Sequence, residues 1–225
     1  MTQRFFLASY PRSGNTLARL LLDHHFDVNA RSSRQGALTA IGEPTKEIQR
    51  IMEVRSGAEM VCLKTHHVKV PERQRKALVL VRDGRDAMVS FTHYLQRFHA
   101  NILPFEALLR RVVMERPSIK PQFPPWRDFY QYWLKEHPGE VVLVRFEDLV
   151  LNQFQVMRNA LHVLYPDVEV VREEPIPTFD ELHHAKPGFF RRGKVGSWRD
   201  EMPPDIEEMF WALNGEMMTG LAYKR

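Results

Sequence analysis

The sequence holds one cysteine, Cys62, among its 225 residues, so no disulfide can form within the chain. This count is typical of a protein kept in a reducing compartment, and the cytoplasm is the expected location. Because Cys62 lies in an apolar run, we expect it to be a small buried hydrophobe. No apolar run approaches the ~20 residues that a membrane-spanning helix needs, and the apolar start is too short for a secretory signal.

Metal-binding spacings are also missing. The chain has two pairs of adjacent histidines, His24-His25 and His183-His184, but sequence neighbours are poorly placed to hold one ion together. No carboxylate-rich segment stands at a spacing that would complete such a site. We therefore expect no metal, and interpret the four histidines as surface or loop residues.

The composition is that of a globular protein with a modest positive charge. Hydrophobic residues make up 44% of the chain, charged residues make up 27%, and the formal net charge is +4. These values exclude a disordered chain and favour an anionic partner, without choosing among nucleotide, nucleic acid and membrane surface. The length suits one domain spanning residues 1–225.

Short apolar runs that alternate with helical patterns predict the fold class. The runs are nearly continuous, as in strands buried on both faces of a parallel sheet. They are Phe5–Ser9, Met60–Lys64, Ala77–Val81 and Val141–Phe146. The helical patterns are Thr16–Phe26, Arg85–Phe98, Phe129–Glu136 and Phe154–Leu164. The alternation predicts an α/β fold with a central, mainly parallel sheet flanked by helices.

Two stretches interrupt this alternation. Residues 27–58 are polar with little apolar periodicity, and residues 99–125 contain five prolines, so much of the second stretch is expected to be loop. Loops over a rigid sheet often build substrate pockets, so we expect both stretches to form loops and helices on the acceptor side. Candidate pocket residues are Tyr94, Phe98, Phe105 and Phe123. The aromatic stripe between residues 126 and 133 is expected to be core.

A first candidate anion site lies between residues 6 and 16, which predict a strand, a tight turn and a helix. Gly14 would let the backbone turn closely around a ligand, and the N–H groups of residues 13–16 would point into one concavity. Arg12 adds a full charge, while Ser13 and Thr16 add hydroxyl donors. The first glycine and the lysine of a nucleoside triphosphate loop are absent. The alternative is a helix capped by Ser13 or Asn15 without a ligand.

A second candidate anion site follows the strand Ala77–Val81. Arg82 stands at the carboxyl end of that strand, where ligands of open α/β sheets bind. Ser90 comes eight residues later, about two turns into the next helix. Arg82 could therefore hold a phosphate with its planar fork while Ser90 reaches it from the helix. The alternative is a surface Arg-Asp cluster with Ser90 facing the core.

A third basic segment lies at residues 188–198. Its cations are Arg191, Arg192 and Lys194. Cations between glycines suggest a mobile loop that folds over an anion, with Phe190, Val195 and Trp198 as possible anchors. The alternative is a solvated charged turn.

Together and in this order, the segments resemble the sulfotransferase family that uses 3′-phosphoadenosine 5′-phosphosulfate (PAPS). The first loop is similar to that family's Tyr-Pro-Lys-Ser-Gly-Thr-Thr loop, which holds the 5′-phosphosulfate, with Arg12 at the lysine position and Asn15 at the first threonine position. The segment from Arg82 to Ser90 is similar to the family's 3′-phosphate motif. The segment Arg191-Arg192-Gly193 is similar to the Arg-Lys-Gly element that holds the same phosphate.

Two further segments extend the resemblance, which spans residues 6 to 198 and implies a P-loop-like nucleotide-binding fold. Leu63-Lys64-Thr65-His66 is similar to the Lys-Thr-His segment that carries the family's general base. The segment that begins with Phe146-Glu147 is similar to the Tyr-Glu-Asp-Leu segment beside the adenine. Two positions depart from the pattern, since Leu17 replaces a frequent tryptophan and Phe146 lacks the tyrosine hydroxyl.

The resemblance implies a mechanism. His66 would take the proton of an acceptor hydroxyl, and Lys64, on the same face of the strand, could hold a sulfuryl oxygen. Arg12 would stabilise charge on the leaving 5′-phosphate but cannot donate a proton to it. His67 is the competing base and is expected on the opposite face. The implied donor is PAPS and the product is adenosine 3′,5′-bisphosphate (PAP), without a metal. The acceptor would be a small molecule or glycan bearing a hydroxyl, and neither nucleic acid nor membrane is expected as a partner.

Two other functions fit parts of the pattern. An ATP- and magnesium-dependent kinase-like phosphotransferase would use Thr16 and Asp83, but its loop lysine is absent. A non-catalytic module that binds a polyanion would use the basic segments alone and would have no role for His66.

Overall fold

The computed structural model of the chain describes residues 3–32, 59–68, 70, 75–98, 103–114, 123–178, 180, 181, 184 and 194–225. A five-stranded sheet lies at its centre, with the order β2-β3-β1-β4-β5, and every neighbouring pair is parallel. The strands are β1 (Gln3–Ser9), β2 (Asn29–Ser32), β3 (Met60–Thr65), β4 (Ala77–Val81) and β5 (Val141–Arg145). The predicted α/β class with a parallel sheet is confirmed.

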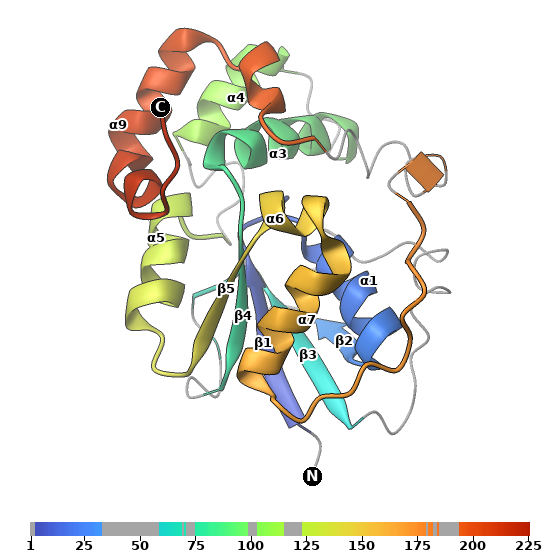
Figure 1. Cartoon of the computed structure of the whole chain (residues 1–225). Coiled ribbons are helices and arrows are strands. Elements are labelled where there is room, and N and C mark those ends of the chain that lie inside the picture. The colour runs from blue at the N-terminus through green and yellow to red at the C-terminus, as the bar shows by residue number, and fades with distance from the viewer. Residues whose placement is uncertain are drawn as a thin grey trace.

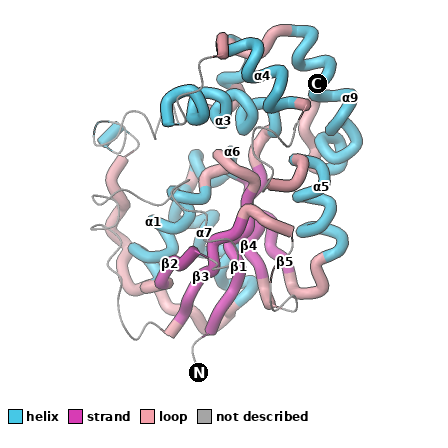
Figure 2. Tube along the Cα trace, turned by 180° about the vertical axis from the view of Figure 1, so that it is seen from behind, coloured by secondary structure: helices cyan, strands magenta, loops and turns pink. Residues whose placement is uncertain are grey.

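The helices cover both faces of the sheet and one of its ends. They are α1 (Asn15–Phe26), α3 (Gly84–Phe98), α4 (Phe105–Val113), α5 (Trp126–Gln131), α6 (Phe146–Leu151), α7 (Gln153–Leu164) and α9 (Pro204–Gly220), with a π-helix η1 (Tyr132–Glu136) and a 3₁₀ turn η2 (Ser197–Asp200). In Figure 1, α1 and α7 lie on one side of the sheet and α5 on the other, while α3, α4 and α9 gather beyond the upper ends of the strands. Figure 2 shows the same arrangement from behind. Those upper ends are the carboxyl ends of the parallel strands.

Alternating side chains of the central strands divide the interior into two cores. Phe6 of β1 and Val79 of β4 face a core shared with α3, α4, α5 and α9. Phe5 and Leu78, one residue away on the same strands, face a second core formed with α1 and α7. Successive side chains of a strand point to opposite faces of the sheet. Because helices cover both faces, both sets of side chains are apolar. Cys62 is fully buried in the second core, as predicted.

The aromatic stripe forms part of the first core, as predicted. Its buried members are Trp126, Phe129, Tyr130 and Trp133. The helix begins at Trp126 rather than at Phe129 and widens into the π-helix η1 from Tyr132 onward. Such wide turns are rare and often mark functional positions.

The two stretches that interrupt the pattern contain one element of a predicted kind and one that was not predicted. The element that was not predicted is strand β2, which lies within residues 27–58 and pairs with β3 at the edge of the described sheet, so it does not need a continuous apolar run. Helix α4 lies within residues 99–125, where loops and helices were expected. Pro104 precedes its first residue, a place where the missing N–H of proline costs nothing, and Leu108, Leu109 and Val112 form its buried face. The fourth predicted strand also ends one residue early, because Phe146 begins α6.

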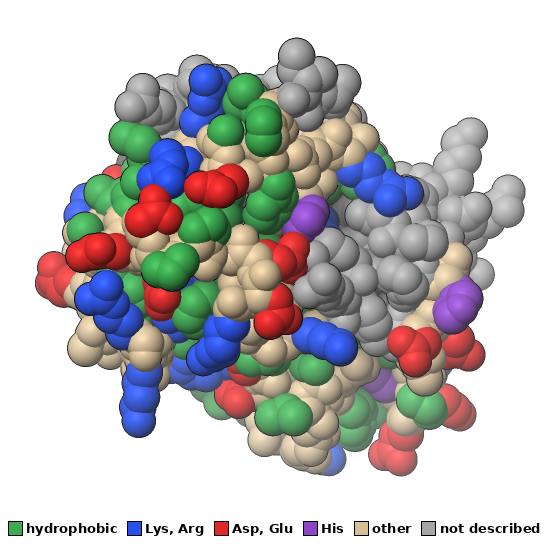
Figure 3. All heavy atoms as spheres, turned by 90° about the horizontal axis from the view of Figure 1, so that it is seen from above, with side chains coloured by type: hydrophobic (Ala, Val, Ile, Leu, Met, Phe, Trp, Pro, Cys, Tyr) green, Lys and Arg blue, Asp and Glu red, His purple; other side chains and the backbone are tan. Residues whose placement is uncertain are grey.

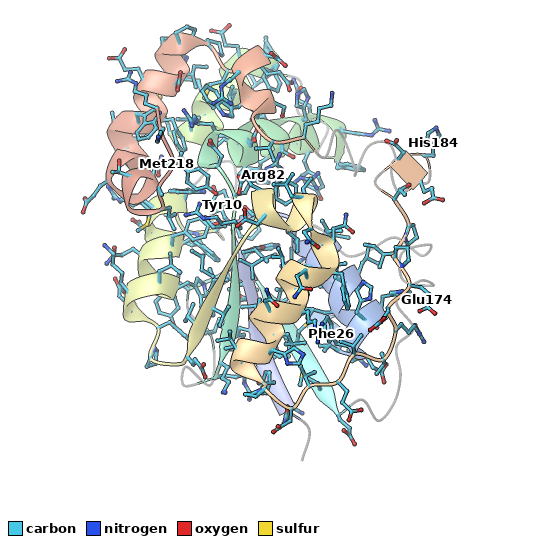
Figure 4. The ribbon with its side chains drawn as sticks, viewed as in Figure 1. Tyr10, Phe26, Arg82, Glu174, His184 and Met218 are labelled. Carbon is cyan, nitrogen blue, oxygen red and sulfur yellow. The ribbon has the colours of Figure 1, made fainter. Side chains whose placement is uncertain are left out.

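The interpretation of His25 as a surface or loop residue is wrong, because it lies in α1 and is only 1% exposed. His24 also lies in α1 but is partly exposed, so it remains a surface residue. The His25 Nδ1 atom lies 2.9 Å from the Arg172 carbonyl oxygen and the His24 Nε2 atom lies 2.8 Å from that of Glu174, so the pair fixes an extended segment alongside α1 (Figure 4). His183 lies outside the described residues. No three His, Cys, Asp or Glu side chains gather into a possible metal site within the described part of the chain. In that same part, no helix has the length and apolar character needed to cross a membrane.

Buried Arg85 joins the C-terminal region to the carboxyl end of β4. Its guanidinium contacts both carboxylate oxygens of Asp83 at 2.8–3.0 Å and lies 2.8 Å from Glu207 of α9. It also donates to the carbonyl of Lys224 at 2.7 Å and lies 3.8 Å from the centre of the Trp198 ring. The buried charge is therefore paired and hydrogen-bonded, as a side chain that is 1% exposed requires.

We predict that Gly84→Ala destabilises the fold because the first residue of α3 packs against aromatic rings. The added methyl would lie 2.5 Å from Phe210 Cζ and 3.0 Å from Trp126 Cε2. Overpacking of this kind costs about 1–3 kcal/mol, measured as the free energy of unfolding in urea. Gly220→Ala is the control, since its methyl meets no atom within 4 Å. Equal stability of Gly84→Ala and the wild type would contradict the packing described here.

Candidate active site

The loop between β1 and α1 folds tightly around the helix N-terminus. Arg12 and Gly14 both adopt left-handed backbone conformations, with φ of 67° and 90°. Gly14 is the N-cap residue of α1, so neither Ser13 nor Asn15 caps the helix. The Asn15 side chain instead donates to Ser9 Oγ at 3.1 Å. A methyl group on Gly14 would lie 2.5 Å from the Phe146 ring. Glycine therefore suits this position for two reasons, the close approach of the ring and the left-handed backbone conformation.

The Arg82 guanidinium lies where the loop, α6 and the C-terminal segment meet. It donates to the backbone carbonyl of Arg12 and to that of Lys194, each at 3.1 Å. Its guanidinium carbon lies 4.4 Å from the centre of the Phe146 ring, and its Nη2 atom lies 3.8 Å from Asp86. Figure 4 shows Arg82 close to Tyr10, between α6 and α3. Arg82 is buried, so the alternative of a surface Arg-Asp cluster is wrong.

The first and second candidate anion sites meet directly. Arg12 Nε donates to Ser90 Oγ at 3.2 Å, and the Arg12 guanidinium lies 5.3 Å from the centre of the Tyr94 ring. Ser90 is therefore buried against Arg12 rather than against the apolar core. Residues far apart in sequence thus place two arginines and a hydroxyl at one end of the sheet.

The third basic segment is described only from Lys194 onward. Arg191, Arg192 and Gly193 lie outside the described residues, as does Phe190. Val195 is 51% exposed and does not anchor the segment, contrary to expectation, whereas Trp198 is buried under Arg85. The carbonyl of Lys194 is held by Arg82, so the end of this segment lies beside the second candidate anion site.

His66 directly follows β3 and is oriented by the end of β1. Its Nδ1 atom lies 2.6 Å from the Ser9 carbonyl oxygen, an acceptor that requires a proton on Nδ1. Nε2 of the neutral ring is then the atom left to accept a proton. Desolvation of the ring lowers its pKa well below the ordinary value, and the charge of nearby Lys64 acts in the same direction. The histidine is therefore held neutral and in one tautomer.

The segment after His66 is fixed by two more contacts. Trp133 Nε1 in the π-helix donates to the carbonyl of His67 at 3.1 Å, and the backbone N–H of His67 donates to Thr65 Oγ1 at 3.1 Å. The rings of both histidines contact Phe123, with centroids 5.6 and 5.7 Å away. Both rings thus meet the same side chain, although opposite faces were expected. Only His66 makes the hydrogen bond to Ser9.

Aromatic rings continue from Phe123 along α3. Phe123 contacts Phe91 at 6.5 Å, Phe91 stacks on Tyr94 at 6.3 Å, and Tyr94 contacts Phe98 at 5.0 Å. Three of the four candidate pocket residues therefore form one series that begins at His66. The fourth, Phe105, packs on His93 instead, at 4.4 Å.

The residues that a kinase-like phosphotransferase would use are arranged differently. Both carboxylate oxygens of Asp83 contact Arg85, and Asp83 N–H donates to Glu147 at 2.9 Å. This pairing does not favour Asp83 as a magnesium ligand. Figure 3 looks down on the carboxyl ends of the strands, where cationic and acidic side chains are mixed over the described surface. This mixture does not favour a polyanion-binding surface.

Sequence reasoning missed three residues that position the site. Asp86 accepts hydrogen bonds from Gly196 and Trp198, Trp133 holds the segment of His66, and the Ser9 carbonyl fixes the imidazole. Nothing local in the sequence marks any of these three contacts.

Comparison with known proteins agrees with this arrangement. Residues 2–222 match the family described as Sulfotransferase domain. Mouse sulfotransferase 1B1 is 22% identical over 95% of this chain and 82% of its own length, and flavonol 3-sulfotransferase of Flaveria bidentis is 24% identical over 97% and 83%. The crystal structure of mouse sulfotransferase SULT7A1 complexed with PAP has the same fold, with a TM-score of 0.66 and 18% identity over 96% of this chain and 84% of that one. The chain therefore belongs to the sulfotransferase domain family and is a sulfotransferase enzyme.

Proposed function

We propose that His66 is the general base of this PAPS-dependent sulfotransferase, and that the acceptor is a small molecule bearing a hydroxyl. The acceptor proton passes to His66 Nε2 while the acceptor oxygen bonds to sulfur and the bond between sulfur and the 5′-phosphate oxygen breaks. The products are the sulfated acceptor and PAP. The single observation that carries this proposal is the 2.6 Å contact between His66 Nδ1 and the Ser9 carbonyl, which leaves Nε2 as the proton acceptor.

The donor set fits a nucleotide with two separate phosphate groups. The loop with Arg12, Ser13, Gly14, Asn15 and Thr16 would receive the 5′-phosphosulfate at the N-terminus of α1. Arg82 and Ser90 would hold the 3′-phosphate, together with Arg191, Arg192 and Gly193. Phe146, between Gly14 and Arg82, would lie beside the adenine. Positive charge in this region stabilises the negative charge that develops on the leaving phosphate.

The two cations nearest the reacting groups would have different roles. Lys64 is buried, and its charge acts on His66, which supports a position beside the transferring sulfuryl group. Arg12 would stabilise the leaving 5′-phosphate without protonating it, because arginine keeps its proton at any pH that the protein experiences. In-line transfer between such groups depends on position and electrostatics rather than on a metal.

The series of aromatic rings supports an apolar or phenolic alcohol as acceptor rather than a glycan. Phe123 contacts the His66 ring, and Phe91 and Tyr94 continue the surface. Aromatic side chains bury large apolar area and favour stacking with another ring. We therefore expect turnover of a simple phenol and little turnover of a monosaccharide. Turnover of the monosaccharide alone would contradict this acceptor class.

Calorimetry with nucleotides tests the assignment of two phosphate sites. We expect PAP to bind more tightly than ADP or ATP, because only PAP carries phosphates for both Arg82 with Ser90 and the loop around Gly14. Its affinity should be the same with and without magnesium. Tighter binding of ATP that depends on magnesium would instead favour the kinase-like phosphotransferase, with Thr16 and Asp83 as site residues.

Replacement of His66 by alanine tests the general base. We expect kcat with the phenol to fall by about 10²–10⁴-fold, the usual contribution of a positioned base, while the Kd of PAP changes little. His67→Ala is the matched control and should change kcat far less, since His67 lacks the contact with Ser9. Equal kcat for His66→Ala and the wild type would remove His66 from the mechanism.

The pH dependence follows from the lowered pKa of His66. The base works when neutral, so kcat/KM is lost as pH falls through the His66 pKa of the free enzyme, and this loss should lie below the ordinary histidine value of about 6.5. Lys64→Met removes a charge that lowers this pKa, so the acid limb of the kcat/KM profile should move to higher pH. Lys76→Met, at the other end of the sheet, should leave the limb in place. An acid limb unchanged by Lys64→Met would contradict the coupling.

A further inference from the structure

The carboxylate of Asp86 has an unusual set of partners for a residue in the first turn of a helix. It is 1% exposed, and both of its oxygens accept hydrogen bonds from the turn that precedes and begins η2. Oδ2 accepts the backbone N–H of Gly196 at 2.7 Å, while Oδ1 accepts the backbone N–H of Trp198 at 2.9 Å and the Ser197 hydroxyl at 3.2 Å. Three donors from one short turn thus surround one buried charge.

This turn has the form of an anion-binding nest. Gly196 adopts the left-handed conformation, with φ of 76° and ψ of 12°, and the following residues form the 3₁₀ turn η2. Successive N–H groups in such a conformation point toward a common centre and bind anions. The anion at this centre is the Asp86 carboxylate of the protein itself. The donors of the turn therefore bind Asp86 and hold the turn against α3. A phosphate would then bind to the residues around the turn rather than in it.

The docked turn is continuous with the surroundings of Arg82. The carbonyl of Lys194, two residues before Gly196, accepts a hydrogen bond from Arg82 Nη2 at 3.1 Å. The same Nη2 atom lies 3.8 Å from Asp86 Oδ2. Arg82 Nη1 donates to the carbonyl of Arg12 in the first loop at 3.1 Å. Asp86 therefore fixes both the end of the third basic segment and the direction of the guanidinium that reaches the first loop.

We infer that Asp86 is a positioning residue for recognition of the 3′-phosphate, because it docks residues 194–198 against Arg82. The inference rests on the proposed function, in which Arg82 and Ser90 hold that phosphate. The charge of Asp86 does not repel the nucleotide strongly, since three donors and Arg82 offset it. An asparagine of the same shape would present an N–H group to donors of the turn, so docking would weaken without a change in volume.

The experiment compares two nucleotides that differ only in the 3′-phosphate. Calorimetry gives the Kd of PAP and of adenosine 5′-phosphate for the wild type and for Asp86→Asn. We expect the Kd of PAP to rise by about 10-fold or more in the variant, with a change in the Kd of adenosine 5′-phosphate below about 3-fold. Hydrogen exchange at the amides of Gly196 and Trp198, measured without nucleotide, should become faster.

Two further variants separate positioning from general stability. Glu207→Gln also replaces a carboxylate by an amide, and it weakens the ion pair with Arg85, which lies over the Trp198 ring, but it removes none of the hydrogen bonds between Asp86 and the turn. This variant should leave unchanged the ratio of the Kd of adenosine 5′-phosphate to the Kd of PAP. Ser197→Ala removes one of the three hydrogen bonds to Asp86 and should lower the ratio by a smaller factor, which keeps the test open if Asp86→Asn does not fold.

The outcomes distinguish this inference from the proposed function. A wild type that binds both nucleotides equally would overturn the 3′-phosphate site itself. A wild type that prefers PAP, together with Asp86→Asn and Ser197→Ala proteins that keep the full preference, would overturn the role of Asp86 alone. Parallel weakening of both nucleotides would also overturn it, since that pattern indicates a structural effect.

Discussion

The contacts of Arg82 connect three segments that the site requires together. Its guanidinium holds the carbonyl of Arg12 in the first loop and the carbonyl of Lys194 in the C-terminal segment, and it lies over the ring of Phe146 at the start of α6. Guanidinium groups suit this position because five donors in one plane can bind several oxygens at once. Arg82 follows the carboxyl end of β4, and ligands of open parallel sheets bind at the carboxyl ends of the strands.

The rest of the structure supports that junction with buried, paired charges. Arg85, three residues after Arg82, ties α9 and the end of the chain to Asp83, and Asp86 ties the turn at Gly196 to α3. Each charge has several partners, which is the condition under which buried ions are tolerated. The proposed base, His66, lies at the carboxyl end of β3, where the Ser9 carbonyl sets its tautomer. The proposed phosphate sites and the proposed base are thus positioned by the carboxyl ends of β3, β1 and β4, which are adjacent in the sheet.

Sequence reasoning located what depends on local pattern. The strand β4 followed by Arg82 and Ser90 was predicted because the apolar run, its end and the helical spacing are all contained in one segment. Asp86 was missed because its partners lie 110–112 residues away, and no local pattern encodes such a contact. Helix α4 was expected somewhere within residues 99–125 but was not located, because prolines were counted without their position, although one directly before a helix does not disrupt it. His25 was placed at the surface because the segment that covers it arrives from near residue 172.

A crystal structure of the protein with PAP would test the two phosphate sites most directly. We expect the 5′-phosphate at the N-terminus of α1 and the 3′-phosphate within about 3.2 Å of donors from Arg82 and Ser90. Asp86 should still occupy the turn at Gly196. A 3′-phosphate bound in that turn in place of the Asp86 carboxylate, or a nucleotide that does not contact Arg82, would contradict these expectations.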